Sequence, residues 1–132
     1  MRLELHRVAL VESQRTARSG RGFSLLRIAP LGWLALEEEM RCLEALVSAR
    51  LRGTDFVTRV RDCEVGVVLI ETVDGEVAAP LQRVREAAVA HFPKLDLRFG
   101  WASVGPRQGN TWQEAWRWAG EVLLGDGARA AA

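Results

Sequence analysis

Apolar side chains recur every three or four residues in four segments of the chain, which is the spacing of one helical face. The predicted helices are Leu3 to Arg18, Trp33 to Leu51, Val77 to His91, and a last helix that runs to Leu124. In the second of these, one apolar face is formed by Leu36, Met40, Leu43 and Val47. The segment Thr111-Trp-Gln-Glu114 has the pattern of a capping box, which opens the last helix.

Runs of β-branched and apolar residues predict four strands between these helices. They cover Phe23 to Ala29, Phe56 to Val60, Val65 to Ile70 and Leu95 to Ser103. The two middle runs flank a short charged tip, Arg61 to Glu64, and therefore predict a β-hairpin. The order α-β-α-β-β-α-β-α predicts one α+β domain with helices packed on a mixed sheet. We place this domain at residues 1–124 and expect residues 125–132 to form a flexible tail.

Composition narrows the class of partners. The 132 residues carry a formal net charge of +1, and the seventeen arginines are scattered along the chain, so the sequence does not favour a nucleic-acid partner. No apolar run approaches the ~20 residues of a membrane-spanning helix. Only Cys42 and Cys63 are present, which favours a reducing cytoplasm over a disulfide scaffold. His6 and His91 have no metal-ligand spacing.

The hairpin carries the one specific motif. Arg52-Gly-Thr-Asp55 is followed by five residues, Phe56 to Val60, then by Arg61-Asp-Cys-Glu-Val65 and the apolar strand Val67 to Ile70. This arrangement resembles the GGDEF family of diguanylate cyclase domains, in which Arg-x-x-Asp precedes a Gly-Gly-Asp/Glu-Glu-Phe hairpin by five residues. The resemblance implies a nucleotidyl-cyclase-like fold, in which helices wrap an antiparallel-rich central sheet.

The order of elements extends the resemblance to most of the chain. Ser24 to Ala29 falls where the family has an apolar strand with an Asp-x-Asp motif, and Leu97 to Ala102 resembles the family's Ser-x-Gly-x-Ala strand. The family's nucleotide-binding loop after the first strand looks deleted between Pro30 and Leu36. Its phosphate-binding lysine in the last helix falls near Leu123 or Leu124.

The departures from the family pattern lie at the positions that would carry catalysis. The two hairpin glycines, which let the backbone approach a nucleotide, are Arg61 and Asp62 here. The metal-binding carboxylate of the tip is Cys63, and the first Asp of the strand motif is Arg27. Only Glu64 keeps its family identity. Because phosphoryl transfer depends on metal ions, the resemblance implies a domain without cyclase activity, metal or cofactor.

The Arg-x-x-Asp motif is retained. In the family, this motif binds the product, cyclic di-GMP, together with an arginine from the helix after the hairpin. Arg83 occupies the place of that arginine here. An arginine fork can bind guanine or phosphate at two points, and a carboxylate can accept from guanine N–H groups. The resemblance therefore implies a cyclic di-GMP receptor that uses Arg52, Asp55 and Arg83 and signals to a protein partner not identified by the sequence.

Two alternatives remain open at the level of sequence. Arg-x-x-Asp is a short motif that recurs at Arg59 and Asp62, and an exposed pair of this kind is often only a surface ion pair worth about 0–1 kcal/mol. The domain would then be a scaffold without nucleotide, acting through protein contacts or as a homodimer. The third hypothesis is GTP binding without turnover. Trp118 lies off the core face of the last helix and is a candidate protein contact.

Overall fold

Four strands form one antiparallel sheet in the order β2-β3-β1-β4. These strands are β1 (Phe23–Pro30), β2 (Phe56–Arg61), β3 (Glu64–Leu69) and β4 (Leu97–Val104). The structure is a computed structural model that describes residues 3–124. The predicted tail, residues 125–132, lies outside the described residues, as do the side chains of Leu3, Trp33 and Leu124.

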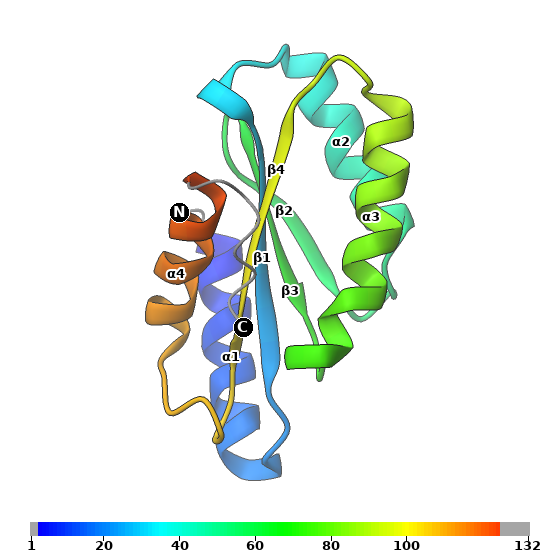
Figure 1. Cartoon of the computed structure of the whole chain (residues 1–132). Coiled ribbons are helices and arrows are strands. Elements are labelled where there is room, and N and C mark those ends of the chain that lie inside the picture. The colour runs from blue at the N-terminus through cyan, green and yellow to red at the C-terminus, as the bar shows by residue number, and fades with distance from the viewer. Residues whose placement is uncertain (1–2, 125–132) are drawn as a thin grey trace.

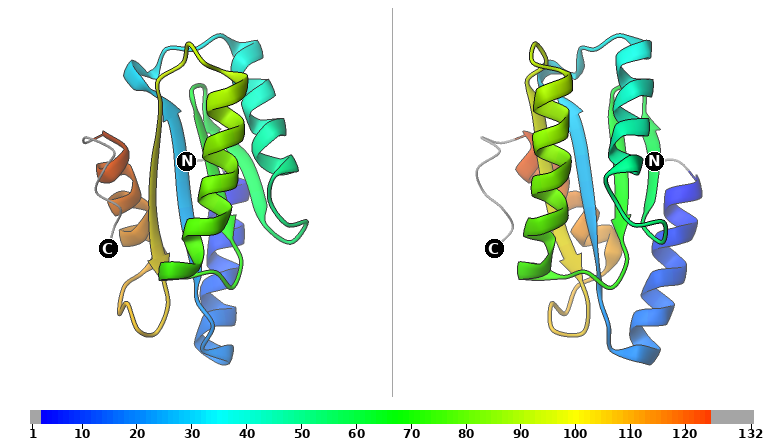
Figure 2. Two further views of the ribbon diagram at one scale, coloured as in Figure 1. Left: turned by 45° about the vertical axis from the view of Figure 1, so that its right-hand side comes forward. Right: turned by 90° about the vertical axis from the view of Figure 1, so that its right-hand side faces the viewer.

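Helices cover both faces of the sheet (Figure 1, Figure 2). One face carries α1 (Leu3–Ser19) and α4 (Trp112–Leu124), and the other carries α2 (Glu37–Ala49) and α3 (Ala78–His91). Two short 3-10 turns, η1 (Leu31–Trp33) and η2 (Asp74–Val77), lie before α2 and α3. The predicted α+β class is therefore confirmed, with three layers. Within residues 3–124, no helix is long and apolar enough to cross a membrane.

The sheet is antiparallel throughout, so the expectation of a mixed sheet was wrong. Strands β1 and β2 are joined through α2 and run in the same direction, but β3 lies between them. Strands β3 and β4 are joined through α3, and β1 lies between those two. Each crossover thus leaves space for an inserted strand, the split βαβ arrangement. Sequence order alone does not reveal this insertion.

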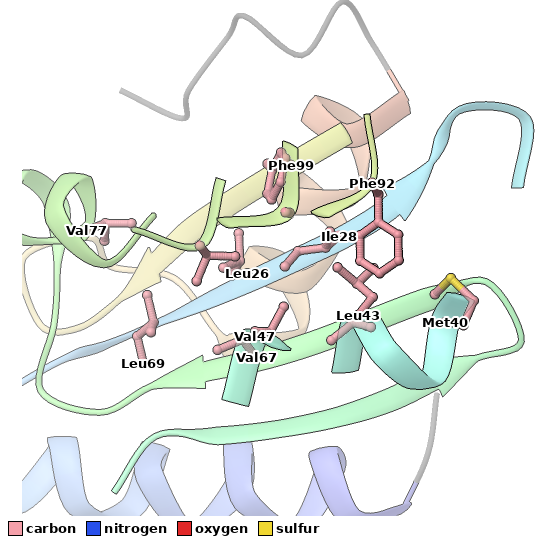
Figure 3. Packing of buried hydrophobic residues seen from close by; sticks show 13 residues of the cluster. Leu26, Ile28, Met40, Leu43, Val47, Val67, Leu69, Val77, Phe92 and Phe99 are labelled. Carbon is pink, nitrogen blue, oxygen red and sulfur yellow. The ribbon is translucent and has the colours of Figure 1, made fainter. Parts of the chain in front are cut away.

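The core has two halves, one on each face of the sheet. Leu26 and Ile28 of β1 pack toward α2 and α3, as Figure 3 shows, whereas Phe23 and Leu25 pack toward α1 and α4. Strand β1 is buried along its whole length, which confirms the prediction that it is central. Helix α4 packs closely on β4 at Gly100. A Cβ at this position would lie 2.0 Å from the Ala119 carbonyl oxygen, so the close packing requires glycine.

The second helix begins later than predicted, at Glu37 instead of Trp33, and ends at Ala49. Leu36, predicted to lie on its core face, is 70% exposed, in an extended segment before the helix. The Glu39 carboxylate accepts a hydrogen bond from the Leu36 backbone N–H at 2.8 Å and so caps the helix here. The helix dipole also favours a first turn that contains three glutamates.

The predicted opening of the last helix is confirmed. The Glu114 N–H donates to Thr111 Oγ1 at 3.1 Å, and the Thr111 N–H donates to Glu114 Oε1 at 2.9 Å. These are the two reciprocal bonds of a capping box. Trp112 is buried in the core below.

Candidate functional site

The hairpin turns through only two residues, Asp62 and Cys63, because β2 extends to Arg61 and β3 begins at Glu64. The pairing of β2 with β3 shifts register between Arg59 and Arg61, which indicates a bulge next to the tip. Successive residues at the start of a strand point to opposite faces of the sheet. Cys63 accordingly packs against the α2–α3 half of the core, and Glu64 faces α4.

The Glu64 carboxylate is fully buried and is bound at both oxygens by Arg27 of β1. Arg27 Nε lies 2.5 Å from Glu64 Oε2, and Arg27 Nη2 lies 3.1 Å from Glu64 Oε1. The two side chains are 9% and 0% exposed, respectively. Arg27 Nη1 also donates to the Trp116 carbonyl oxygen at 3.0 Å, and the guanidinium lies 4.4 Å from the centre of the Trp116 ring. The charge of Arg27 is therefore matched by a carboxylate and an indole face.

These residues do not fit a divalent metal ion. The carboxylate that the tip retains is already bound by an arginine, and a second arginine, Arg61, places its Nε 3.7 Å from Glu64 Oε1. The Cys63 sulfur is directed elsewhere, 3.9 Å from the Ala35 carbonyl oxygen. A hard cation such as Mg²⁺ binds through several oxygen ligands. Among the described residues, no three His, Cys, Asp or Glu side chains gather closely enough to hold a metal.

Arg59 fastens the tip to helix α2. Its guanidinium forms a hydrogen-bonded ion pair with Glu37 and lies 4.0 Å from Glu44, and Nη1 donates to the Asp62 carbonyl oxygen at 3.3 Å. The hydrogen bond to Glu37 raises the pKa of Arg59 above its ordinary value. The second Arg-x-x-Asp of the sequence therefore serves to attach the hairpin to a helix.

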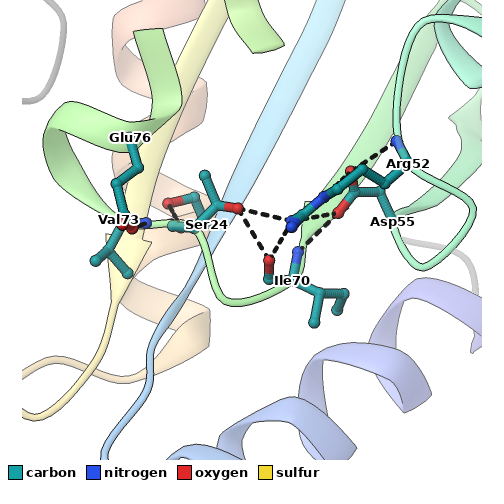
Figure 4. Close-up of polar contacts among 7 residues, drawn as sticks. Ser24, Arg52, Asp55, Ile70, Val73 and Glu76 are labelled. Carbon is teal, nitrogen blue, oxygen red and sulfur yellow. Dashed lines mark hydrogen bonds and ion pairs between the residues drawn. The ribbon is translucent and has the colours of Figure 1, made fainter. Parts of the chain in front are cut away.

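At the base of the hairpin, Asp55 accepts four contacts. Its Oδ2 accepts from the Arg52 backbone N–H at 3.1 Å and Nε at 3.4 Å, and its Oδ1 accepts from the Ile70 N–H at 3.0 Å and Arg52 Nη2 at 3.3 Å (Figure 4). The Asp55 side chain is 2% exposed, whereas that of Arg52 is 56% exposed. Asp55 thus closes the turn before β2 and joins it to the end of β3.

Arg52 extends this contact into the connection after β3. Its Nη2 donates to the Ile70 carbonyl oxygen at 2.5 Å and to Thr72 Oγ1 at 2.9 Å. The Thr72 carbonyl oxygen accepts from Ser24 Oγ at 2.6 Å, and Ser24 lies 2.8 Å from Ser103 Oγ (Figure 4 shows the Ser24 end). Sequence reasoning missed this polar chain. Its only sequence signal is that Ser24 and Ser103 are hydroxyl residues in strands that are mostly apolar.

The three residues predicted to bind a ligand line one pocket. It has a volume of about 280 Å³, and its lining residues are Arg52, Asp55, Glu71, Thr72, Glu76, Pro80 and Arg83. Arg52 and Asp55 come from the turn before β2, and Arg83 comes from α3. Among residues 3–124, Arg83 has one hydrogen bond, from Nε to the Arg50 carbonyl oxygen at 3.3 Å. A second pocket, of about 480 Å³, adjoins the first and shares Arg52, Asp55 and Glu71 with it.

The two glutamates of the smaller pocket, like Asp55, have partners of their own. Glu71 forms an ion pair with Arg21 at 2.9 Å, and Glu76 Oε1 accepts the Val73 backbone N–H at 3.0 Å. The two arginines of the pocket therefore remain the groups suited to an anionic or guanine-containing ligand. The other predicted surface residue, Trp118, is exposed on α4.

No family model matches the sequence, and no curated protein matches it. Several solved structures do match this chain. A DGC protein from Thermotoga maritima superposes with a TM-score of 0.75 at 11% identity, over 91% of this chain and 92% of that one. The GGDEF domain of DgcB from Caulobacter crescentus, in complex with c-di-GMP, gives 0.73 at 13% identity, over 90% and 80%. The chain has the GGDEF fold.

A third GGDEF neighbour is part of a larger protein. The diguanylate cyclase SiaD from Pseudomonas aeruginosa, in complex with its activator SiaC, gives a TM-score of 0.72 at 16% identity. The match covers 92% of this chain and 52% of SiaD, so the chain spans about half of that structure. The nucleotidyl-cyclase-like fold expected from the hairpin motif is confirmed by these structures.

Proposed function

We propose that this chain is a signalling domain of the GGDEF fold that does not form cyclic di-GMP but binds it and passes the signal to a protein partner. The observation that carries the proposal is the meeting of Arg52, Asp55 and Arg83 around one pocket. Two neighbours with the same fold support it by analogy, since one is a complex with c-di-GMP and one a complex with an activator protein.

The lack of cyclase activity is supported by the ion pair at the hairpin tip. Cyclase chemistry requires metal ions that neutralise the phosphates of GTP and stabilise the transition state. Here the buried charge facing Glu64 is the guanidinium of Arg27, which is permanently positive. Purified protein incubated with GTP and Mg²⁺ is expected to yield no cyclic di-GMP. Product formation above that of a GTP-only blank would contradict the proposal.

The pocket assigns different roles to its residues. Arg52 is held at Nε and Nη2 but makes no described contact through Nη1, so its half-exposed guanidinium is oriented in advance for a ligand. Within the described part of the chain, Arg83 has one hydrogen bond, to a backbone carbonyl, so its guanidinium can turn toward a phosphate or a guanine edge. Asp55 is nearly buried, so we assign it the role of holding Arg52 in place. A volume of about 280 Å³ suits one guanine–phosphate half of the ligand.

Titration calorimetry with cyclic di-GMP tests this site. Wild type should give a saturable heat, and Arg52→Ala and Arg83→Ala should each weaken binding by about tenfold or more, the loss of one charge-assisted contact. Arg117→Ala is the matched control, because Arg117 lies on α4 and is well exposed. No heat with folded wild-type protein would reject cyclic di-GMP as the ligand. Equal affinities for wild type and Arg83→Ala would reject the site.

One observation favours the alternative, a scaffold that acts through protein contacts without nucleotide. Asp55 and the Nη2 of Arg52 are already engaged in holding the hairpin base together, which is a structural role sufficient to explain the motif. Under this alternative, wild type gives no heat with cyclic di-GMP or with GTP. A heat with GTP alone would instead support nucleotide binding without turnover.

A further inference from the structure

The larger pocket, of about 480 Å³, lies between helix α1 and the base of the hairpin, and we call it the α1 pocket. Helix α1 supplies Val8, Glu12 and Arg15 to its lining. In Figure 4, α1 is the blue helix along the lower edge of the view. Because Arg52 and Asp55 line both this pocket and the smaller one, a single ligand can extend past Arg52 from one pocket into the other.

Part of the α1 pocket is apolar. Val8, Phe56 and Ile70 line it, and all three are partly buried residues that pack against the half of the core on the α1–α4 face. Phe56 adds an aromatic ring to this apolar part. Flat heterocyclic bases bind on surfaces of this kind, because aromatic and aliphatic side chains cover their faces. The apolar part of the α1 pocket therefore suits a nucleobase.

Glu12 is a nearly buried carboxylate in the lining of the α1 pocket. Its side chain is 8% exposed, and among residues 3–124 its one contact of opposite charge is Arg15, at 3.7 Å, which is too long for a hydrogen bond. Glu64 and Asp55, the two carboxylates that are more deeply buried, each accept hydrogen bonds at both oxygens. A buried charge without hydrogen bonds is costly. Glu12 therefore offers two acceptor oxygens to N–H groups of a ligand.

We propose that the α1 pocket holds the second guanine of cyclic di-GMP and that Glu12 determines specificity for that base. This inference rests on the proposed function, in which the smaller pocket binds the other guanine–phosphate half. A guanine presents two adjacent N–H donors, at N1 and N2, which match the two oxygens of a carboxylate. An adenine presents one donor and one acceptor on the same edge, so one Glu12 oxygen would face a lone pair. One ligand molecule thus bridges the two pockets of one chain.

Titration calorimetry of the wild-type protein with cyclic di-GMP and with cyclic di-AMP tests this bridging. The expected result is one molecule of cyclic di-GMP per chain, and an affinity for cyclic di-AMP that is lower by about tenfold or more. Two molecules of cyclic di-GMP per chain, or equal affinities for the two ligands, would overturn the inference and leave the proposed function standing. No heat with cyclic di-GMP would reject the proposed function and this inference with it.

The variant Glu12→Gln separates recognition of the base from a structural role of Glu12. Its amide keeps the shape of the side chain but offers one acceptor and one donor, which is the pattern that matches adenine. The variant should bind cyclic di-GMP about tenfold more weakly, or worse, and cyclic di-AMP more tightly than wild type does. Glu4→Gln is the matched control, because Glu4 is an exposed glutamate in the first turn of the same helix, and it should leave both affinities unchanged.

Circular dichroism checks that both variants are folded. A folded Glu12→Gln variant with the affinities of wild type would overturn the inference. Weaker binding of both ligands in the same proportion would overturn it equally, because a structural glutamate has that effect without reading the base. If Glu12→Gln fails to fold, the stoichiometry and the ligand preference of the wild-type protein decide.

Discussion

The two ends of the β2–β3 hairpin each hold an arginine–carboxylate pair, yet the pairs differ in burial. At the tip, Arg27 and Glu64 are both inside the protein, 9% and 0% exposed. At the base, Asp55 is buried at 2%, but Arg52 is 56% exposed. The contact atoms are alike, and both arginines are bound through Nε and Nη2. The difference in exposure decides which guanidinium can meet a ligand.

The two arginine–carboxylate pairs therefore have different roles in the same fold. The tip pair neutralises itself within the core and leaves no charge for a metal or phosphate. The base pair uses its carboxylate to orient an arginine at the surface of a pocket. Substitutions that remove one partner at each end should therefore have effects of different size and kind.

The largest effect is expected for Glu64→Ala. This change leaves the Arg27 guanidinium buried without its partner, which should lower the free energy of unfolding by about 3–5 kcal/mol, as measured by urea denaturation. The double variant Arg27→Met, Glu64→Leu should recover most of that loss, because apolar residues of similar size can replace a buried ion pair. A cost below about 1 kcal/mol for Glu64→Ala would show that the tip pair is as solvated as a surface pair.

A smaller effect is expected for Asp55→Ala at the base. The change leaves the Ile70 N–H and the Arg52 N–H without their acceptor and should cost about 1–3 kcal/mol of stability. Asp96→Ala is the control, because Asp96 also pairs with an arginine but is 59% exposed, and its loss should cost at most about 0.5 kcal/mol. If the two variants unfold at the same denaturant concentration, Asp55 has no special role in closing the turn.

Local patterns in the sequence predicted the elements and the convergence of the pocket residues. Hydrophobic spacing placed Met40, Leu43 and Val47 on the buried face of α2, where the structure has them. The resemblance to the GGDEF family implied that Arg52, Asp55 and Arg83 form one site, and in the structure the three residues line one pocket. These features depend on short-range periodicity and on a motif with fixed offsets.

Non-local pairing accounts for what the sequence did not predict. Arg27 and Glu64 were each singled out as degenerate positions, but their ion pair joins residues 37 positions apart. The pair depends on the β1–β3 register, in which Arg27 lies opposite Gly66. The sheet is fully antiparallel because β3 lies between β1 and β2, and β1 lies between β3 and β4. The exposed Leu36 escaped prediction because the three glutamates set the helix start after it.

The smallest effect on stability, and the sharpest on function, is expected for Arg83→Ala. Arg83 makes one long backbone contact, at 3.3 Å, so its removal should change the free energy of unfolding by no more than about 0.5 kcal/mol. Arg52→Ala should differ, since Arg52 also bonds Ile70 and Thr72, and its loss should lower both stability and affinity for cyclic di-GMP. Denaturation and calorimetry on the two variants separate a residue that serves the ligand alone from one that also holds the hairpin. If Arg83→Ala lowers stability as much as Arg52→Ala does, the pocket arginines are structural, and the base of the hairpin resembles its tip.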